Sequence, residues 1–107
     1  MSIHVCEDGS KVDILNDLIP YIKYKGYQPV QVLTHYLIPS DGLNIDENSP
    51  RYKAANTKYP LIAIEKDDLF KLVDGRHRLK KLMNERQMTC SVYFITEDEL
   101  NLFKRVL

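Results

Sequence analysis

One stretch decides the fold: Val73-Asp74-Gly75-Arg76-His77-Arg78-Leu79-Lys80-Lys81-Leu82. It follows alternating apolar and polar residues at 69–73, which predict a strand, and it continues into leucines at helical spacing. Glycine tolerates the backbone angles of a sharp turn, and Asp74 can cap the helix that begins behind it. The first N–H groups of that helix, at Gly75, Arg76 and His77, then point outward with the positive end of its dipole and form a seat for an anion.

Positively charged side chains cluster at the same turn. Arg76, Arg78, Lys80 and Lys81 follow one another closely, and His77 adds a further donor. Either these charges are the solvated face of an ordinary helix, or they hold an anion. Arginine in the first turn opposes the helix dipole, so a bound anion would relieve a local conflict. We therefore predict a phosphate site in which Gly75 lets the ligand approach the backbone while Arg76, His77, Arg78 and Lys80 supply donors.

The turn resembles a known signature. Leu72-Val73-Asp74-Gly75-Arg76-His77-Arg78-Leu79 is similar to the Gly-x-His-Arg or Gly-x-Arg-Arg signature of the ParB/sulfiredoxin superfamily. From about Val30 to Thr96 the expected order of strands, loop and helices follows the same superfamily. The resemblance implies an α/β (α+β) domain with a small mixed sheet flanked by helices, which binds nucleotide phosphates at this turn. Arg76 stands where sulfiredoxin-like chemistry needs a cysteine, so the resemblance does not imply sulfinic-acid reduction.

Length and composition favour one soluble domain. The chain has 107 residues, of which 44% are hydrophobic and 28% charged, with a formal net charge of zero. No global positive field attracts nucleic acid, so any basic patch must be local. The sequence shows neither a secretory signal nor a long apolar run, and the cytoplasm is the expected location. Cys6 and Cys90 form no metal or redox pattern, and Cys90 is expected to be a buried thiol in a strand.

Residues 1–26 form an extension in front of the shared pattern. A short strand at 3–6 is followed by apolar residues at helical spacing from Val12 to Ile22, which predict a helix bent at Pro20. Tyr21, Tyr24 and Tyr27 near its end either stack on bases or pack with their rings inward, and we favour packing. The extension could also bind a partner.

A loop that carries carboxylates separates the first shared strand, at 28–37, from a short helix. Asp41, Asp46 and Glu47 lie in this loop, which the resemblance places beside the phosphate site. Glu47 or Asp46 is the candidate catalytic carboxylate, as a general base or through Mg²⁺; the alternative is that all three are solvated. Ser49 and Pro50 begin the helix. The resemblance makes Arg51 a candidate phosphate ligand, and the alternative is a surface charge.

The rest of the core, 27–96 in all, alternates strand and helix. Strands are expected at 61–65, 69–73 and 90–95, with a hairpin turn at 66–68. A helix over 76–86 buries one narrow stripe of leucine and methionine. A last helix over 97–107 begins with a capping threonine and is apolar enough to dock on the core or on a second subunit, so a homodimer is compatible with the sequence.

Two residues of the turn have open roles. Asp74 would repel phosphate unless a cation intervened, so it either caps the turn, which we favour, or helps hold Mg²⁺. His77 is either a hydrogen-bonded structural residue or a catalytic and phosphate-binding one.

The leading hypothesis is a nucleotide-binding domain that takes ATP or CTP with Mg²⁺, with or without hydrolysis. The second hypothesis is a DNA-binding or nuclease module, because the same cations could follow a nucleic-acid backbone. The third is a small accessory or inhibitor protein, of the kind that phages and mobile elements encode, which uses the fold to bind another protein.

Overall fold

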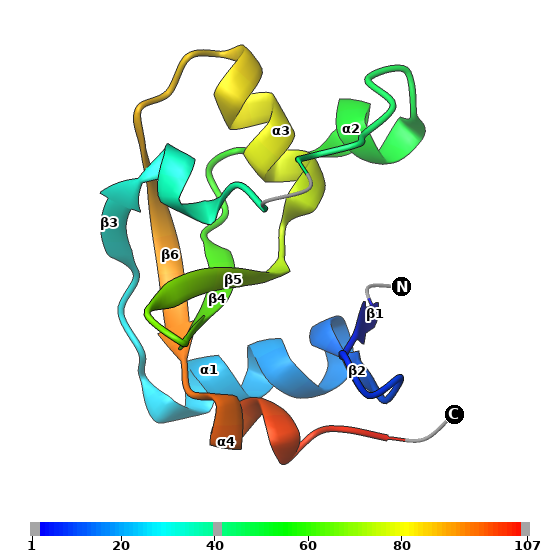
Figure 1. The fold of residues 1–107 in the computed structure, drawn as a ribbon, viewed down its shortest axis with the longest axis vertical. Helices are drawn as coiled ribbons and strands as arrows, with labels where there is room; N and C mark the ends of the chain where they lie inside the picture. The colour runs from blue at the N-terminus through cyan, green and yellow to red at the C-terminus, as the bar shows by residue number, and fades with distance from the viewer. Residues whose placement is uncertain (1–2, 40–41, 106–107) are drawn as a thin grey trace.

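The structure, a computed structural model of the chain, describes residues 3–39 and 42–105. It is a mixed α+β fold with a two-stranded and a four-stranded sheet, as expected from the sequence (Figure 1). The strands are β1 Ile3–Val5, β2 Lys11–Asp13, β3 Val30–Leu33, β4 Leu61–Lys66, β5 Leu69–Asp74 and β6 Thr89–Ile95. The helical segments are the π-helix η1 Ile14–Leu18, α1 Ile19–Lys25, the 3₁₀ helix η2 Thr34–Leu37, α2 Pro50–Ala54, α3 Arg76–Asn84 and α4 Glu97–Asn101.

The larger sheet has the strand order β3-β6-β4-β5. β4 and β5 form a hairpin whose turn residues, Asp67 and Asp68, both have positive φ (54° and 62°), as a two-residue hairpin turn with the favoured twist requires. The chain then crosses over through α3, so that β6 pairs parallel to β4 and antiparallel to β3. This order leaves β3 and β5 at the two edges of the sheet.

Apolar side chains cover both faces of this sheet. Along β4, Leu61 and Ala63 point to one face, while Ile62 and Ile64 point to the other. The first face packs under α3 and η2, and the second packs under η1, α1 and α4 (Figure 1). Burying each large aliphatic side chain contributes about 1.5–3 kcal/mol, so both layers are needed for a chain of this size.

The N-terminal extension belongs to one of these layers. Val12, Ile14, Leu18 and Ile22 are all at most 2% exposed and lie in the same core cluster as the sheet. The helix that we expected from Val12 begins at Ile14 instead, because Val12 pairs with His4 in the β1–β2 hairpin. The Asp13 side chain accepts a hydrogen bond from the Asn16 amide (3.0 Å) and so caps the start of η1.

The three tyrosines near the end of α1 differ in burial. Tyr21 and Tyr27 pack their rings against the core, as expected, and their hydroxyl groups both donate to Oε2 of Glu99. Tyr24 is 87% exposed, so the expectation that it packs inward is wrong. It lies on the outer face of α1, where helical spacing from buried Ile22 turns its side chain to solvent.

The last helix is shorter than the sequence suggested. α4 ends at Asn101, and Leu102 is exposed, which corrects the expected helix over 97–107. Beyond the helix, the backbones of Arg105 and Lys11 bond to each other in an isolated antiparallel bridge (2.8 and 2.9 Å). The chain therefore leaves the helix to add a short extended segment beside β2. Val106 and Leu107 lie outside the described residues, as does Asp41.

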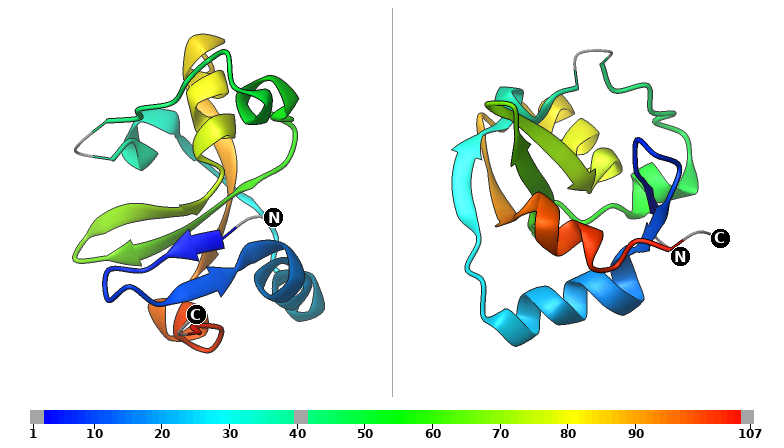
Figure 2. Two further views of the ribbon diagram at one scale, coloured as in Figure 1. Left: turned by 90° about the vertical axis from the view of Figure 1, so that its right-hand side faces the viewer. Right: turned by 60° about the horizontal axis from the view of Figure 1, so that its bottom comes forward.

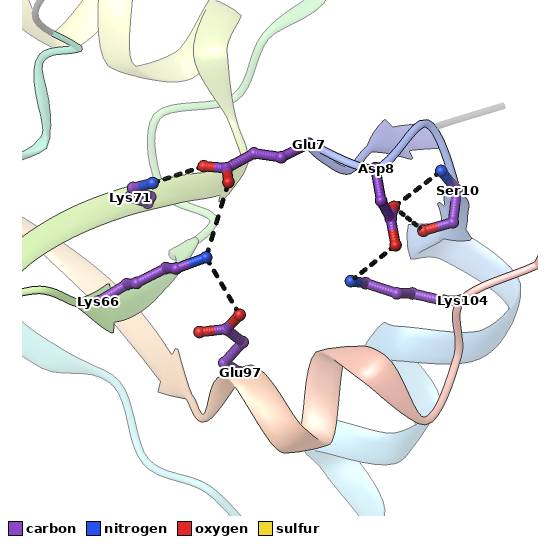
Figure 3. A network of polar contacts seen from close by, with 7 residues as sticks. All are labelled: Glu7, Asp8, Ser10, Lys66, Lys71, Glu97 and Lys104. Atoms are coloured by element: carbon purple, nitrogen blue, oxygen red, sulfur yellow. Dashed lines mark hydrogen bonds and ion pairs between the residues drawn. The ribbon is translucent and has the colours of Figure 1, made fainter.

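Charged side chains tie the β1–β2 hairpin to the rest of the fold. Figure 3 shows Glu7, in the turn after β1, between Lys71 of β5 and Lys66 of β4, at 2.6 and 3.7 Å. Lys66 also contacts Glu97 of α4 (3.2 Å), and Asp8 contacts Lys104 (3.6 Å). As a result the hairpin lies beside the β4–β5 hairpin (Figure 2). In the described ranges, no helix is long and apolar enough to cross a membrane.

A candidate anion-binding groove at the start of α3

A groove of about 1020 Å³ runs along the edge strand β5 to the first turn of α3. Residues of β1, of η2 and α2, and of the segments that follow these two helices also line it. Six of the residues predicted for the phosphate site lie on this groove: Arg51, Asp74, Gly75, Arg76, His77 and Arg78. The fold thus brings Arg51 to the turn across a gap of more than twenty residues in sequence.

Gly75 is required by the geometry of the turn. Its φ is +108°, and a Cβ built on it would lie 2.3 Å from Cδ2 of Leu61. Any other residue would meet both backbone strain and a steric clash with the core. The Gly75 carbonyl accepts the first helical hydrogen bond, from the Leu79 amide (2.8 Å), and no side chain caps the start of α3. The amides of the first turn are therefore left for another acceptor.

Asp74 does not cap α3, which corrects our expectation. Its Oδ2 accepts a hydrogen bond from Arg78 at 2.5 Å, one helical turn further along. The other side of the Arg78 guanidinium donates to the carbonyl of Pro60 (2.8 Å), and both charged side chains are less than one-fifth exposed. Two acceptors hold Arg78, so it positions the turn, and its role as a phosphate ligand stays a prediction.

Arg51, Arg76 and His77 meet at the α3 end of the groove. Burial lowers the pKa of His77, and the positive charges of Arg51 and Arg76 lower it further. His77 is therefore neutral at pH 7 and can either donate or accept a hydrogen bond. The mutual repulsion among these groups would be relieved by an anion bound between them.

Lys81 fixes the helix that carries Arg51. Its Nζ donates to the carbonyls of Tyr52, Lys53 and Ala55 at 3.1–3.2 Å, at the C-terminal end of α2. A cation there adds a donor for the carbonyls at the end of α2, of which that of Tyr52 also accepts from the Ala55 amide (3.2 Å), and it complements the helix dipole. The sequence offered no sign of this role, because Lys81 looked like one more charge on a basic helix.

Three other predicted site residues lie elsewhere. Lys80 and Glu47 approach each other at 4.0 Å, and Glu47 also accepts from Asn84 (3.0 Å). Asp46 accepts from the amide of Asn48 (2.9 Å) in its own loop. None of the three lines the groove. Glu47 lies along the side of α3 and Asp46 bonds within its own loop, so the structure does not bring the expected catalytic carboxylates to the turn.

His4 is a groove residue that sequence reasoning missed. It lies in β1, hydrogen-bonds the backbone of Val73 and faces the charge of Asp74. Burial lowers the pKa of His4 in spite of both contacts. A histidine in the N-terminal segment carries no local signal, because its approach to β5 depends on the hairpin docking against the sheet.

The described residues do not form a metal cage. Within 3–39 and 42–105 no three His, Cys, Asp or Glu side chains come close enough to hold an ion. Asp74 is the groove's acidic residue in the described part of the chain, and one of its oxygens is bound to Arg78. Mg²⁺ would fit here only if the ligand's own oxygens supplied most of its coordination.

Comparisons of the chain with family models, with curated proteins and with solved structures give no match.

Proposed function

We propose that the protein binds the phosphate groups of a nucleotide at the α3 end of the groove. The observation that carries this proposal is the convergence of Arg51, Arg76 and His77 on an uncapped helix N-terminus. Backbone amides, a helix dipole and guanidinium groups together suit a phosphate. The resemblance of 72–79 to the ParB/sulfiredoxin superfamily supports the same ligand class, with ATP or CTP as the first candidates and Mg²⁺ carried on the phosphates.

The arrangement favours binding over hydrolysis. Phosphoryl transfer needs little beyond positioning and charge stabilisation, but the attacking water still has to be oriented. Asp46 and Glu47 lie outside the groove, and Asp74 is held by Arg78. Neutral His77 is then the group best placed to accept a proton, so any turnover would depend on it.

The cations of α3 do not form one track for a DNA backbone. Arg78 is engaged by Asp74, Lys80 faces Glu47, and Lys81 caps α2. Arg76 is the member of this group that faces the groove and is exposed. A protein with few phosphate contacts gains little from counterion release, so we do not propose DNA binding or nuclease activity.

The experiment measures thermal stability with ATP, CTP, GTP and inorganic triphosphate, each with and without Mg²⁺. A ligand at a hundred times its dissociation constant should stabilise the protein by about 2.7 kcal/mol. Arg76→Ala should abolish this gain, whereas Arg86→Ala, beyond the other end of α3, should keep it. Arg78→Ala is a poor choice because it removes a structural contact.

Binding should also strengthen as the pH falls below 6.5. Protonated His77 adds a charge and a donor, and a bound anion would raise its lowered pKa. If no nucleotide or triphosphate stabilises the wild type between pH 5.5 and 7.5, the proposal fails.

A further inference from the structure

Two strands, β1 and β5, line the groove along their whole length. Every residue of β5, from Leu69 to Asp74, lines it, and so does every residue of β1, from Ile3 to Val5. Successive side chains of a strand point to opposite faces of its sheet. A groove that touches consecutive residues of both strands therefore runs along their edges.

The hydrogen-bonding pattern shows which amides of β5 point into the groove. Lys66 and Leu69 flank a two-residue turn and so bond to each other. In an antiparallel pair, bonded and non-bonded residues alternate. Phe70 and Leu72 therefore direct their N–H and C=O groups away from β4, toward the groove.

β1 offers a matching edge. The Cys6 amide bonds back to Ser10 (2.8 Å), and Lys11 turns its backbone outward to Arg105. By the same alternation, Val5 and Ile3 direct their amides away from β2 and into the groove. No strand pairing joins β1 to β5 in the described part of the chain.

Side chains link the two strands at their ends. Glu7 reaches across to Lys71 near one end, as Figure 3 shows, and His4 reaches the Val73 backbone near the other. Two unpaired edges beside a lined groove are a template for an added strand. Such a strand would join both sheets into one.

The rim of the groove indicates what kind of strand fits. Apolar side chains stand exposed around it, namely Ile3, Val5, Tyr36 and Leu69. The α3 end is cationic, with Arg51, Arg76 and His77. An extended segment with alternating apolar side chains and a carboxylate at one end would complement both features.

We propose that the groove between β1 and β5 binds an extended segment of a partner protein as an added β-strand, with an acidic group of that segment at the start of α3. This goes beyond nucleotide binding and does not depend on it. Because both ligands would use the same cationic end, a nucleotide that binds there should displace the peptide.

The test selects binders from a displayed library of random eight-residue peptides, using the intact chain as bait. We expect the enriched peptides to alternate apolar and polar residues and to carry an acid at one end. Val5→Pro removes a groove-facing amide without breaking a pair with β2, and Pro is tolerated at such edge positions. It should weaken the selected peptides by about tenfold, which corresponds to one main-chain hydrogen bond.

Two controls isolate the main-chain contact. Val5→Ala shortens the same side chain but keeps the amide, so it should bind much more tightly than Val5→Pro. Leu33→Pro places proline at the opposite edge of the sheet, where φ is already −67°, and should bind as the wild type does.

Amide exchange provides a second measurement that needs no variant. A selected peptide should protect Phe70 and Leu72 of β5 together with Val5 of β1. The proposal is overturned if no peptide is enriched, if Val5→Pro binds as well as Val5→Ala, or if protection appears elsewhere. Loss of nucleotide binding alone would leave these results unchanged, so the two proposals can fail separately.

Discussion

At Gly75, a left-handed backbone conformation forms the turn between β5 and α3. We predict that Gly75→Ala destabilises the protein by about 2–4 kcal/mol, because it adds both backbone strain and a clash with Leu61. Urea unfolding at pH 7 measures this change. Gly26→Ala is the matched control, since Gly26 also has positive φ but has no atom within 4 Å of the added Cβ. It should cost about 1 kcal/mol. If the two variants lose the same free energy of unfolding, the clash with Leu61 contributes nothing to the loss at Gly75.

The local sequence predicts the turn at Gly75, but it does not predict the contacts of Asp74 and Arg78. The turn follows from glycine's conformational freedom, which needs no knowledge of the fold. Asp74 was expected to cap α3 because capping is the local choice for such a residue. Its actual partner, Arg78, is oriented by the carbonyl of Pro60, which approaches from a separate segment. That contact exists only once β4 lies beside β5, so the pairing could not be predicted from the motif.

Among the elements, α2 is linked to α3 by side chains of α3, and Lys81 contacts its C-terminal end. We predict that Lys81→Ala loosens α2, because three carbonyls at its end lose the donor that Lys81 supplies. The expected cost is about 1 kcal/mol. Amide exchange in α2 should accelerate, and nucleotide affinity should fall as Arg51 loses its fixed position. Lys53→Ala, on an exposed position of α2 itself, is the control. If amide exchange in α2 is the same in Lys81→Ala as in the wild type, Lys81 does not stabilise α2.

The contact between α1 and α4 depends on pH through Glu99. Burial raises the pKa of Glu99, but hydrogen bonds from Tyr21, Tyr27 and Thr96 outweigh it and lower the pKa to about 2. A carboxylate with a lowered pKa stabilises the folded state above its ordinary value of 4.5 and loses that contribution as the pH falls toward 2. We predict that the stability difference between the wild type and Glu99→Gln shrinks over this range. Urea unfolding at several pH values checks this. If the free energies of unfolding of the two proteins differ by the same amount at every pH, the prediction is wrong.

Element boundaries were predictable where the signals were local. Thr96 caps α4 and Ser49-Pro50 begins α2, both as expected. The end of α4 was not predictable, because apolar residues continue past Asn101. The chain leaves the helix there to pair Arg105 with Lys11, and this pairing requires the N-terminal hairpin to be in place.

For the whole molecule, the attachment of the β1–β2 hairpin should depend on salt. Glu7, Lys66 and Lys71 form an exposed network, and salt screens such charges. We predict that amide exchange in residues 3–13 accelerates between 0.05 and 1 M NaCl in the wild type, on the order of several-fold. Glu7→Gln should exchange faster at low salt and respond much less. If the amide exchange rates of residues 3–13 do not change with salt in either protein, the apolar contacts of β2 alone hold the hairpin.

The fold class followed from the sequence because strand, turn and helix signals are local and recur in a consistent order. The joining of the N-terminal segment to the core did not follow, since it depends on Val12 and Ile14 meeting β4 and β6 from the far side of the sheet. The groove depends on the same long-range packing. Its cationic end could be anticipated from the turn, whereas the wall that β1 supplies could not.

The Glu99 cluster also gives the protein an optical reporter. The chain has no tryptophan and seven tyrosines, so its intrinsic fluorescence comes from tyrosine. An excited phenol is a stronger acid than its ground state, and one that donates to a carboxylate passes on its proton and loses its emission. We therefore expect Tyr21 and Tyr27 to emit little light while both donate to Glu99 of α4. Brightening on denaturation would follow the separation of these two helices without any attached dye.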